Sequence, residues 1–377
     1  MISRILQPFI EKELFKGKII ILYGARRTGK TTLVKEIRNK YNGKSGYFSC
    51  DEPDIRDAFT EKTSTELKKI LGDNKLVILD EAQRVKNIGI TLKLIADNIK
   101  NIQVIATGSS SFDLSNMVIE PLTGRKREFF LFPLTIEELQ PLYSAMEISR
   151  LVQRWMILGL YPEIVISETD AEKNLKEIAR SYSYKDILQF QNIRNPEILE
   201  KLLQALSVQS GNEVSYNELA DLLQIDKNTV SGYIRILEKA FIIFRLGPFS
   251  RNLRTELKKL RKIYFYDTGI RNALINNFNP LHLRQDTGSL WENFLISERR
   301  KYLFNHGLDI QSYYWRTKQQ QEIDYLEEGA GKMRAFEIKW KKESFKTPEI
   351  FSKTYPGCPV GLINNKNYFN FCTSEDI

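Results

Sequence analysis

Cysteine and histidine are scarce in this sequence of 377 residues. The three cysteines, Cys50, Cys358 and Cys372, are widely separated, and there are only two histidines. Zinc sites in proteins are built mainly from cysteine and histidine, so a zinc site of that kind is excluded. An odd, scattered set of cysteines also provides no disulfide framework and suits a reducing compartment. We therefore expect a cytoplasmic protein.

Long hydrophobic runs and targeting segments are missing as well. No apolar stretch approaches the roughly 20 residues of a transmembrane helix, and no signal peptide is recognisable, so we expect no membrane span. Hydrophobic residues make up 42% of the chain and charged residues 27%, which is typical of a globular protein. The net charge of +9 is compatible with a polyanionic partner such as DNA.

A phosphate-binding motif lies close to the start of the chain. Residues 24–31 match the pattern G-x-x-x-x-G-K-[ST]. The apolar segment 18–23 predicts a strand before it, and 31–40 predict a helix after it, which is the context that the motif requires. Lys30 would reach the β- and γ-phosphates of ATP, and the Thr31 hydroxyl would hold Mg²⁺. The predicted nucleotide-binding residues are Gly24, Ala25, Arg26, Arg27, Thr28, Gly29, Lys30, Thr31 and Thr32.

A second motif supports hydrolysis of the nucleotide. Segment 75–81 is a continuous apolar run that ends in two carboxylates, as in a buried parallel strand with an acidic end. Asp80 would orient Mg²⁺ through water, and Glu81 would polarise the attacking water as a catalytic residue. The adjacent glutamate indicates the P-loop branch in which a third strand separates the two strands that carry these motifs. A helix cap after a strand is the alternative.

Two residues are candidates for sensing the γ-phosphate. Segment 102–106 predicts another buried strand, and Thr107 at its end is in a sensor position, although an ordinary strand-to-loop turn would look the same. Arg125 precedes a predicted strand at 127–131. It could approach a γ-phosphate of its own chain or of a neighbouring subunit; a solvated basic turn is the alternative.

Strands that alternate with helices predict an α/β fold in which a parallel P-loop NTPase sheet binds ligands at its carboxyl edge. After this core the pattern becomes helical and predicts a lid that reports the state of the γ-phosphate. We predict four parts: a P-loop ATPase core at 1–132, a helical lid at 133–192, a winged helix at 193–262 and a nuclease-like α/β domain at 263–377.

The predicted winged helix offers a surface for DNA. Its three helices are expected at 198–208, 216–223 and 228–240, and a wing strand begins at 241. The third helix would enter the major groove. A basic run would contact phosphates, and it consists of Arg251, Arg254, Lys258, Lys259, Arg261 and Lys262. Because winged helices also dock proteins, a protein partner is the alternative.

The last part contains a second candidate active site. In the strand predicted at 334–340, the period of two places Glu337 and Lys339 on one face, where Asp324 can face them from a neighbouring strand. Two carboxylates, Asp324 and Glu337, could hold Mg²⁺, and Lys339 could steady the attacking water in phosphodiester cleavage. Glu292, on a preceding helix, is the fourth candidate catalytic residue. A surface ladder of alternating charges is the alternative.

These motifs recur in an order that resembles a known family. They are G-A-R-R-T-G-K-T-T, L-V-I-L-D-E-A-Q, T-G-S-S-S, L-T-G-R, L-G-L-Y-P-E, Y-K-D-I, I-Y-F-Y-D-T-G and W-E-N-F. Together they resemble the prokaryotic AAA-like ATPases related to signal-transducing ATPases with numerous domains, which carry a C-terminal domain of unknown function similar to PD-(D/E)xK nucleases. The resemblance implies ATP or ADP binding, the winged helix, the nuclease-like fold and the catalytic candidates named above. One departure is a Gly-Leu-Tyr-Pro turn where the family commonly has Gly-Gly.

The sequence therefore predicts an ATP-binding and ATP-hydrolysing switch that acts on DNA through a winged helix and a nuclease-like domain. The alternative is a nucleotide-gated regulator or protein-binding adaptor whose nuclease-like domain is inactive.

Overall fold

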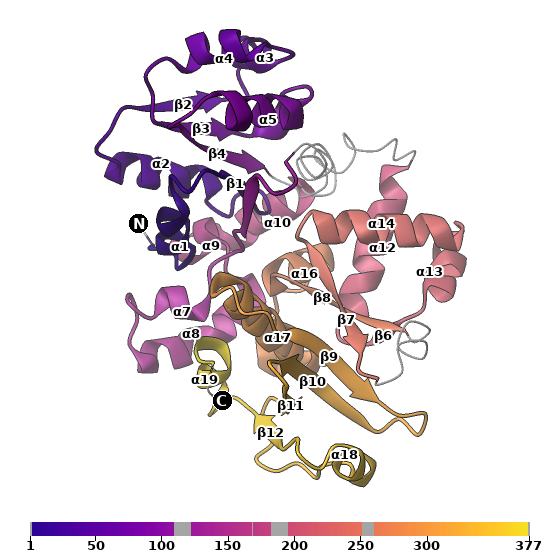
Figure 1. Ribbon diagram of the computed structural model, residues 1–377. Coiled ribbons are helices and arrows are strands. Elements are labelled where there is room, and N and C mark those ends of the chain that lie inside the picture. The colour runs from indigo at the N-terminus through magenta and orange to yellow at the C-terminus, as the bar shows by residue number, and fades with distance from the viewer. Residues whose placement is uncertain (1, 109–121, 168, 182–194, 251–259, 376–377) are drawn as a thin grey trace. The chain divides into compact units, whose positions relative to one another are not determined.

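The computed structural model describes residues 2–108, 122–167, 169–181, 195–250 and 260–375, and it divides the chain into two compact units (Figure 1). Unit 1 consists of Met1–Pro133 with Lys239–Phe241, and unit 2 of Leu134–Glu238 with Ile242–Ile377. Each unit is built around its own β-sheet.

Unit 1 has a five-stranded parallel sheet with the order β2-β3-β4-β1-β5. Strand β4 separates β1 from β3, as the sequence predicted. The elements are α1 (Leu6–Glu13), β1 (Ile19–Tyr23), α2 (Lys30–Lys40), β2 (Ser45–Ser49), α3 (Pro53–Phe59), α4 (Ser64–Leu71), β3 (Leu76–Asp80), η1 (Ala82–Arg84), α5 (Ile88–Asn98), β4 (Gln103–Gly108) and β5 (Lys126–Phe130).

The central strands of this sheet are continuous hydrophobic runs because helices cover both of their faces. All five residues of β1 and all five of β3 are buried, whereas those of the edge strand β2 are half-buried. Helix α2 presents Leu33, Val34 and Ile37 to the core. The carboxyl ends of β1, β3 and β4 therefore meet at one edge of the sheet, next to the start of α2.

Unit 2 has a mixed seven-stranded sheet with the order β12-β11-β10-β9-β7-β8-β6. A parallel pairing of β7 with β9 joins the strands expected in the wing to those of the C-terminal part. The predicted boundary between 262 and 263 falls inside β8. The strands are β6 (Glu213–Val214), β7 (Ile243–Pro248), β8 (Arg261–Phe265), β9 (Gln311–Arg316), β10 (Glu322–Gly329), β11 (Lys332–Ile338) and β12 (Val360–Ile363).

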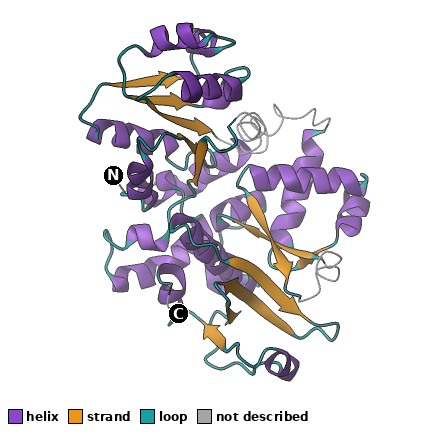
Figure 2. Cartoon of the chain, in the orientation of Figure 1, coloured by secondary structure: helices purple, strands orange, loops and turns teal. Residues whose placement is uncertain are grey.

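Several helices of unit 2 begin at residues whose side chains cap them. Ser144 and Thr135 form capping boxes with Glu147 and Glu138, and Ser215 accepts the Glu218 N–H. The helices are α7 (Ile136–Leu139), α8 (Ala145–Leu158), α9 (Pro162–Ile166), α10 (Ala171–Ser181), α12 (Pro196–Val208), α13 (Tyr216–Leu223), α14 (Lys227–Lys239), α16 (Thr268–Leu274), η3 (Leu281–Leu283), α17 (Thr287–Asn305), α18 (Glu349–Thr354) and α19 (Tyr368–Thr373). Figure 2 colours the helices purple and the strands orange.

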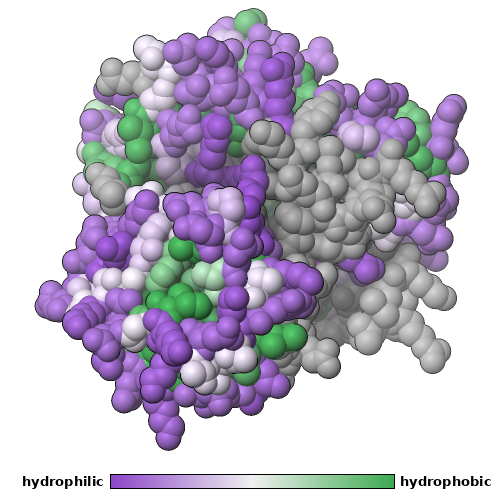
Figure 3. All heavy atoms as spheres, turned by 90° about the horizontal axis from the view of Figure 1, so that it is seen from above, coloured by the Kyte–Doolittle hydropathy of each residue, from purple (hydrophilic) through white to green (hydrophobic). Residues whose placement is uncertain are grey.

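Some predictions fall outside the described residues. The helical lid predicted at 133–192 is described only as far as residue 181, with residue 168 left out. Residues 109–111 of the T-G-S-S-S motif lie outside the description, as do Y-K-D-I and the basic positions 251, 254, 258 and 259. Within the part that is described, no helix is long and apolar enough to cross a membrane. Of the surface that Figure 3 colours by hydropathy, most is hydrophilic, with separate hydrophobic areas.

Candidate functional site

The phosphate loop of unit 1 has the backbone shape that its glycines predict. Gly29 is in the left-handed region with φ of 96°, and α2 begins at the next residue. A Cβ atom on Gly24 would lie 2.2 Å from the carbonyl oxygen of Leu131, so only glycine fits there. Lys30 is buried, and its Nζ donates to the carbonyl oxygens of Gly24 at 2.9 Å and Ala25 at 3.0 Å. The glycine cradle fits a phosphate chain, with the Lys30 ammonium held inside the loop.

The other loop residues differ in exposure. Thr28 is fully buried and donates from Oγ1 to the Ala25 carbonyl at 2.8 Å, which closes the turn. Arg26 is half-buried, whereas Arg27 and Thr32 are exposed. The loop thus consists of a buried inner layer and an accessible outer one.

Asp80 is the centre of a hydroxyl cluster at the end of β3. Its Oδ2 accepts a hydrogen bond from Thr31 Oγ1 at 2.8 Å and another from the Tyr47 hydroxyl at 2.6 Å, and its Oδ1 accepts one from Thr107 Oγ1. The Thr107 hydroxyl oxygen also accepts the Glu81 N–H at 3.0 Å. The parallel sheet thereby brings together the predicted Thr31, Asp80, Glu81 and Thr107.

Tyr47 was missed by the sequence reasoning. It stands two residues before the end of β2, and Ser49 at that end pairs with Asp80 in the register of β2 and β3. Burial and the hydrogen bond to Asp80 raise the pKa of Tyr47, so the phenol stays a donor at neutral pH. The only sequence signal for Tyr47 is a side chain with a terminal hydroxyl in a strand predicted near the strand that ends in Asp80.

Glu81 has an unusual backbone for a glutamate. Its φ is 54°, in the left-handed region that non-glycine residues seldom occupy. Gln83 Nε2 donates a hydrogen bond to Glu81 Oε2 at 2.5 Å. The short helix η1 begins at Ala82, directly after Glu81. Strained backbone at a candidate catalytic residue is typical of functional sites.

Arg125 does not lie near its own phosphate loop, which corrects one of the two predicted placements. Strand β5 runs parallel to β1 with Ile19 opposite Lys126, so Arg125 stands where β1 begins, whereas the phosphate loop follows where β1 ends. The strand length puts roughly 16 Å between the two sheet edges. Arg125 Nε instead donates to Asp97 Oδ1 at 2.6 Å. Contact with a neighbouring subunit stays a prediction.

Arg4 is a second residue that the sequence reasoning missed. It is 7% exposed, and it donates to the carbonyl oxygens of Thr28 at 2.7 Å and Phe132 at 2.6 Å. Phe132 is next to Pro133, the last residue of the N-terminal segment of unit 1. Arg4 therefore ties the backbone of the phosphate loop to the segment that leads into unit 2.

The second candidate site, in unit 2, brings together three predicted residues: Asp324 of β10, Glu337 of β11 and Lys339, which directly follows β11. Lys339 Nζ lies 3.0 Å from Asp324 Oδ2 and 2.7 Å from Glu337 Oε1. Asp324 Oδ2 also accepts the Ile338 N–H at 2.9 Å. Burial and the neighbouring Asp324 raise the pKa of Glu337 to about 7, and its buried Oε2 has no hydrogen-bond partner among the described residues.

Glu292 of α17 lies beside this cluster and is paired with Lys262. Glu292 Oε1 accepts hydrogen bonds from the Tyr264 hydroxyl at 2.6 Å and from Lys262 Nζ at 3.2 Å. Lys262 also pairs with Glu322. Lys262 was expected to contact DNA phosphates, but it is 2% exposed, so that expectation is wrong. Burial raises the pKa of Glu292 to about 7, and the nearby Asp324 adds to the effect.

The carboxylates of unit 2 fit a divalent cation only in a restricted way. Among the described residues, no group of three or more histidine, cysteine, aspartate or glutamate side chains is arranged to hold a metal ion. Asp324 and Glu337 supply two carboxylates, and the buried Oε2 of Glu337 is left unbonded by the part of the chain that the structure describes. Mg²⁺ is commonly held by one or two carboxylates with water and substrate phosphates, so these two residues fit that mode.

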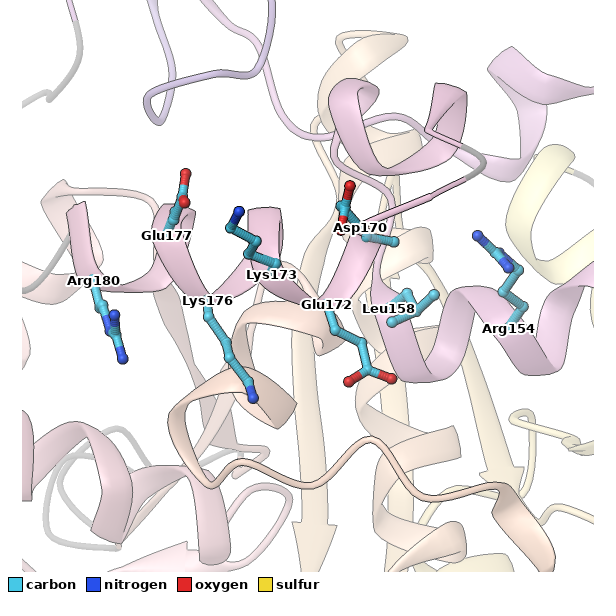
Figure 4. A pocket seen from close by; sticks show the side chains of 9 residues that line it. Arg154, Leu158, Asp170, Glu172, Lys173, Lys176, Glu177 and Arg180 are labelled. Atoms are coloured by element: carbon cyan, nitrogen blue, oxygen red, sulfur yellow. The ribbon is translucent and has the colours of Figure 1, made fainter.

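A cavity elsewhere in unit 2 is unrelated to these residues. It has a volume of about 650 Å³ and lies beside α8 and α10. In Figure 4 its charged side chains point to different sides of α10 and do not converge on one point. The arrangement therefore does not indicate a ligand site.

Comparison with known proteins identifies the parts of the chain. Residues 16–140 match the family model described as an AAA domain. Residues 149–281 and 287–371 match two models described as domains of unknown function, DUF8612 and DUF4143. The chain therefore carries an AAA domain of the P-loop ATPase type, followed by a C-terminal domain whose function is not known.

Relatives with a similar extent are uncharacterised. A protein of Mycobacterium tuberculosis is 27% identical over 338 residues, which cover 88% of this chain and 72% of that protein. One of Methanocaldococcus jannaschii is 27% identical over 353 residues, covering 88% and 76%. A solved structure, the Pif1 helicase from Candida albicans, has a TM-score of 0.27 and 16% identity, with 48% of each chain covered. This chain thus spans about half of that helicase.

Proposed function

We propose that this protein is an ATP-dependent switch: its AAA domain binds and hydrolyses Mg-ATP, and the nucleotide state controls a C-terminal half that acts on DNA. The observation that carries the proposal is the hydroxyl cluster at Asp80, placed at the same sheet edge as the glycine cradle. Thr31 and Asp80 would hold Mg²⁺, which neutralises phosphate charge when bound. Glu81 would orient the attacking water.

Coupling to the rest of the chain is supported by two contacts beneath the phosphate loop. Arg4 bridges the carbonyls of Thr28 and Phe132, and Gly24 packs directly on the backbone of Leu131. A movement of the loop on nucleotide binding would therefore reach residues 131–133, where the chain leaves unit 1. A nucleotide switch requires a connection of this kind between the loop and the segment that responds to it.

Hydrolysis can be tested with Glu81→Gln. This variant keeps the size of the side chain but removes its charge, so it should bind ATP like the wild type and turn it over at least tenfold more slowly. The measurement is release of inorganic phosphate at saturating Mg-ATP. Equal turnover by the two proteins would remove Glu81 from this role.

Action on DNA is supported by the order of elements in residues 196–265. Helices α12, α13 and α14 are followed by the antiparallel pair β7–β8, with β6 beside β8, which is the order of a winged helix. Lys227 and Asn228 are exposed at the start of α14, where a recognition helix would meet DNA.

DNA binding can be measured by fluorescence anisotropy of a labelled duplex at several salt concentrations. The affinity for DNA should fall steeply as the salt concentration rises. Lys227→Ala should weaken binding and reduce the salt slope by about one, because it removes one phosphate contact. Lys332→Ala, which changes an exposed lysine on β11, is the matched control. Absence of binding at low salt would point to a protein partner instead.

Two candidate functions exist for the acid–lysine cluster. A metal-dependent nuclease is supported by the convergence of Asp324, Glu337 and Lys339; cleavage of linear, circular or single-stranded DNA should then be lost in Lys339→Ala. An inactive, binding-only domain is favoured by Lys339, which already forms an ion pair with one oxygen of each carboxylate. Intact DNA after incubation with wild-type protein, Mg²⁺ and ATP would support this second function.

A further inference from the structure

Asp80 is held by three hydroxyl groups, and one of them belongs to a residue outside every motif of the nucleotide site. The Tyr47 hydroxyl donates to Asp80 Oδ2 at 2.6 Å, and the same oxygen accepts the Thr31 hydroxyl at 2.8 Å. Oδ1 accepts the Thr107 hydroxyl. Because Asp80 is only 4% exposed, side chains of the protein set the orientation of its carboxylate.

The position of Tyr47 is itself fixed by packing. Its ring packs against the core cluster that includes Leu33 and Val34 of α2. Lys35 Nζ lies 4.8 Å from the centre of the ring. With the ring held by α2 and the backbone by the pairing of β2 with β3, the hydroxyl has a defined place beside Asp80.

We propose that Tyr47 is a positioning residue of the Mg²⁺-nucleotide site, which acts through Asp80 and sets the affinity for the metal. The inference rests on the proposed nucleotide-binding function. Partners that hydrogen-bond a metal-binding carboxylate typically contribute 10–100-fold to metal affinity. The glycine cradle and Lys30 would face the phosphates without Tyr47, so affinity for nucleotide without metal should not depend on it.

The test is Tyr47→Phe in the full chain, which removes only the hydroxyl. A fluorescent ATP analogue is titrated first in EDTA and then, at a fixed concentration, with Mg²⁺. The affinity in EDTA should stay within about twofold of wild type, and the apparent Mg²⁺ affinity should fall about tenfold. Tyr41→Phe, which alters a tyrosine packed on the same core cluster, should change neither value.

A double mutant shows whether the effect passes through Asp80. If it does, Tyr47→Phe should add no further loss of Mg²⁺ affinity to Asp80→Asn, whereas additive losses would overturn the inference. Equal Mg²⁺ affinity in wild type and Tyr47→Phe would overturn the inference too. So would a loss of nucleotide affinity in EDTA that is as large as the loss of Mg²⁺ affinity. If the wild-type protein binds nucleotide but Mg²⁺ does not increase its affinity for nucleotide, this inference is overturned and the proposed nucleotide binding is not. Failure to bind nucleotide at all overturns the proposed function with it.

Discussion

Asp267 accepts a hydrogen bond from the backbone N–H of Leu160 at 2.7 Å, and this contact joins two of the most recognisable motifs of the chain. Its other oxygen accepts the Ile270 N–H at 3.1 Å. Gly159 packs so closely on Asp267 that a Cβ atom there would lie 2.0 Å from Oδ1. The L-G-L-Y-P-E and Y-D-T-G segments thus form one internal joint of unit 2, where the role of Asp267 is structural.

Removing this joint should destabilise unit 2. Asp267→Ala leaves two backbone N–H groups without their acceptor in a site where Asp267 is 5% exposed, so we expect a loss of about 2–4 kcal/mol in unfolding free energy. Chemical denaturation followed by tryptophan fluorescence would measure it. Asp309→Ala, at an exposed aspartate, is the control and should have little effect. A variant as stable as wild type would contradict the structural role.

Arg4→Ala should impair the phosphate loop although Arg4 lies outside the motif. The change removes donors from the buried carbonyls of Thr28 and Phe132, which should cost about 2 kcal/mol of stability and weaken ATP binding. Arg4→Lys should rescue only in part, since a single ammonium replaces a planar fork. Calorimetric unfolding and ATP titration provide the measurements. Unchanged values in Arg4→Ala would show that the bridge is dispensable.

The stability of unit 2 should depend on the ionisation of Glu292. Its pKa is raised from an ordinary 4.5 to about 7 by burial, so the folded state holds a proton that the unfolded state releases. The resulting stabilisation is complete below about pH 4.5 and is lost as pH rises through 7, with a size on the order of 3 kcal/mol.

Glu292→Gln removes this dependence. Relative to wild type, the variant should become progressively more stable between about pH 5 and pH 8, as measured by denaturation at a series of pH values. A difference that stays constant across this range would contradict the raised pKa.

Lys262 should be required for folding of the cluster around it. Lys262→Met leaves the carboxylates of Glu292 and Glu322 without this buried cation, so we expect a loss of about 3–5 kcal/mol. The double variant Lys262→Met/Glu292→Gln should lose less than the single change, because the carboxylate that Lys262 no longer neutralises at Glu292 is gone, while Glu322 keeps its ion pair with Arg316. Losses that simply add would show that the pair is not coupled.

Much of the architecture could be predicted from the sequence. The continuous apolar runs at 18–23 and 75–81 and the helical stripe after the phosphate loop predicted β1, β3 and α2 within a residue or two. They could do so because buried parallel strands and amphipathic helices leave strong periodic patterns. The convergence of Asp324, Glu337 and Lys339 followed from the period of two in β11.

The rest depended on pairings between distant segments. Tyr47 and Arg4 stand in no motif, and only strand register and the fold of the N-terminal segment bring them to the site. Arg125 was misplaced because the direction of β5 decides which sheet edge it occupies. Lys262 belonged to an apparent basic run, yet the sheet buries it among carboxylates. The fourfold domain division and the roles of the site residues stay predictions.

The most direct test of the account is calorimetric titration of Mg-ATP into the wild-type chain and into Lys30→Ala. We predict saturable binding of one nucleotide per chain to the wild type and at least tenfold weaker binding to the variant, because Lys30 belongs to the phosphate cradle. Well-folded wild-type protein that takes up neither adenine nor guanine nucleotides, or equal binding by both proteins, would contradict it.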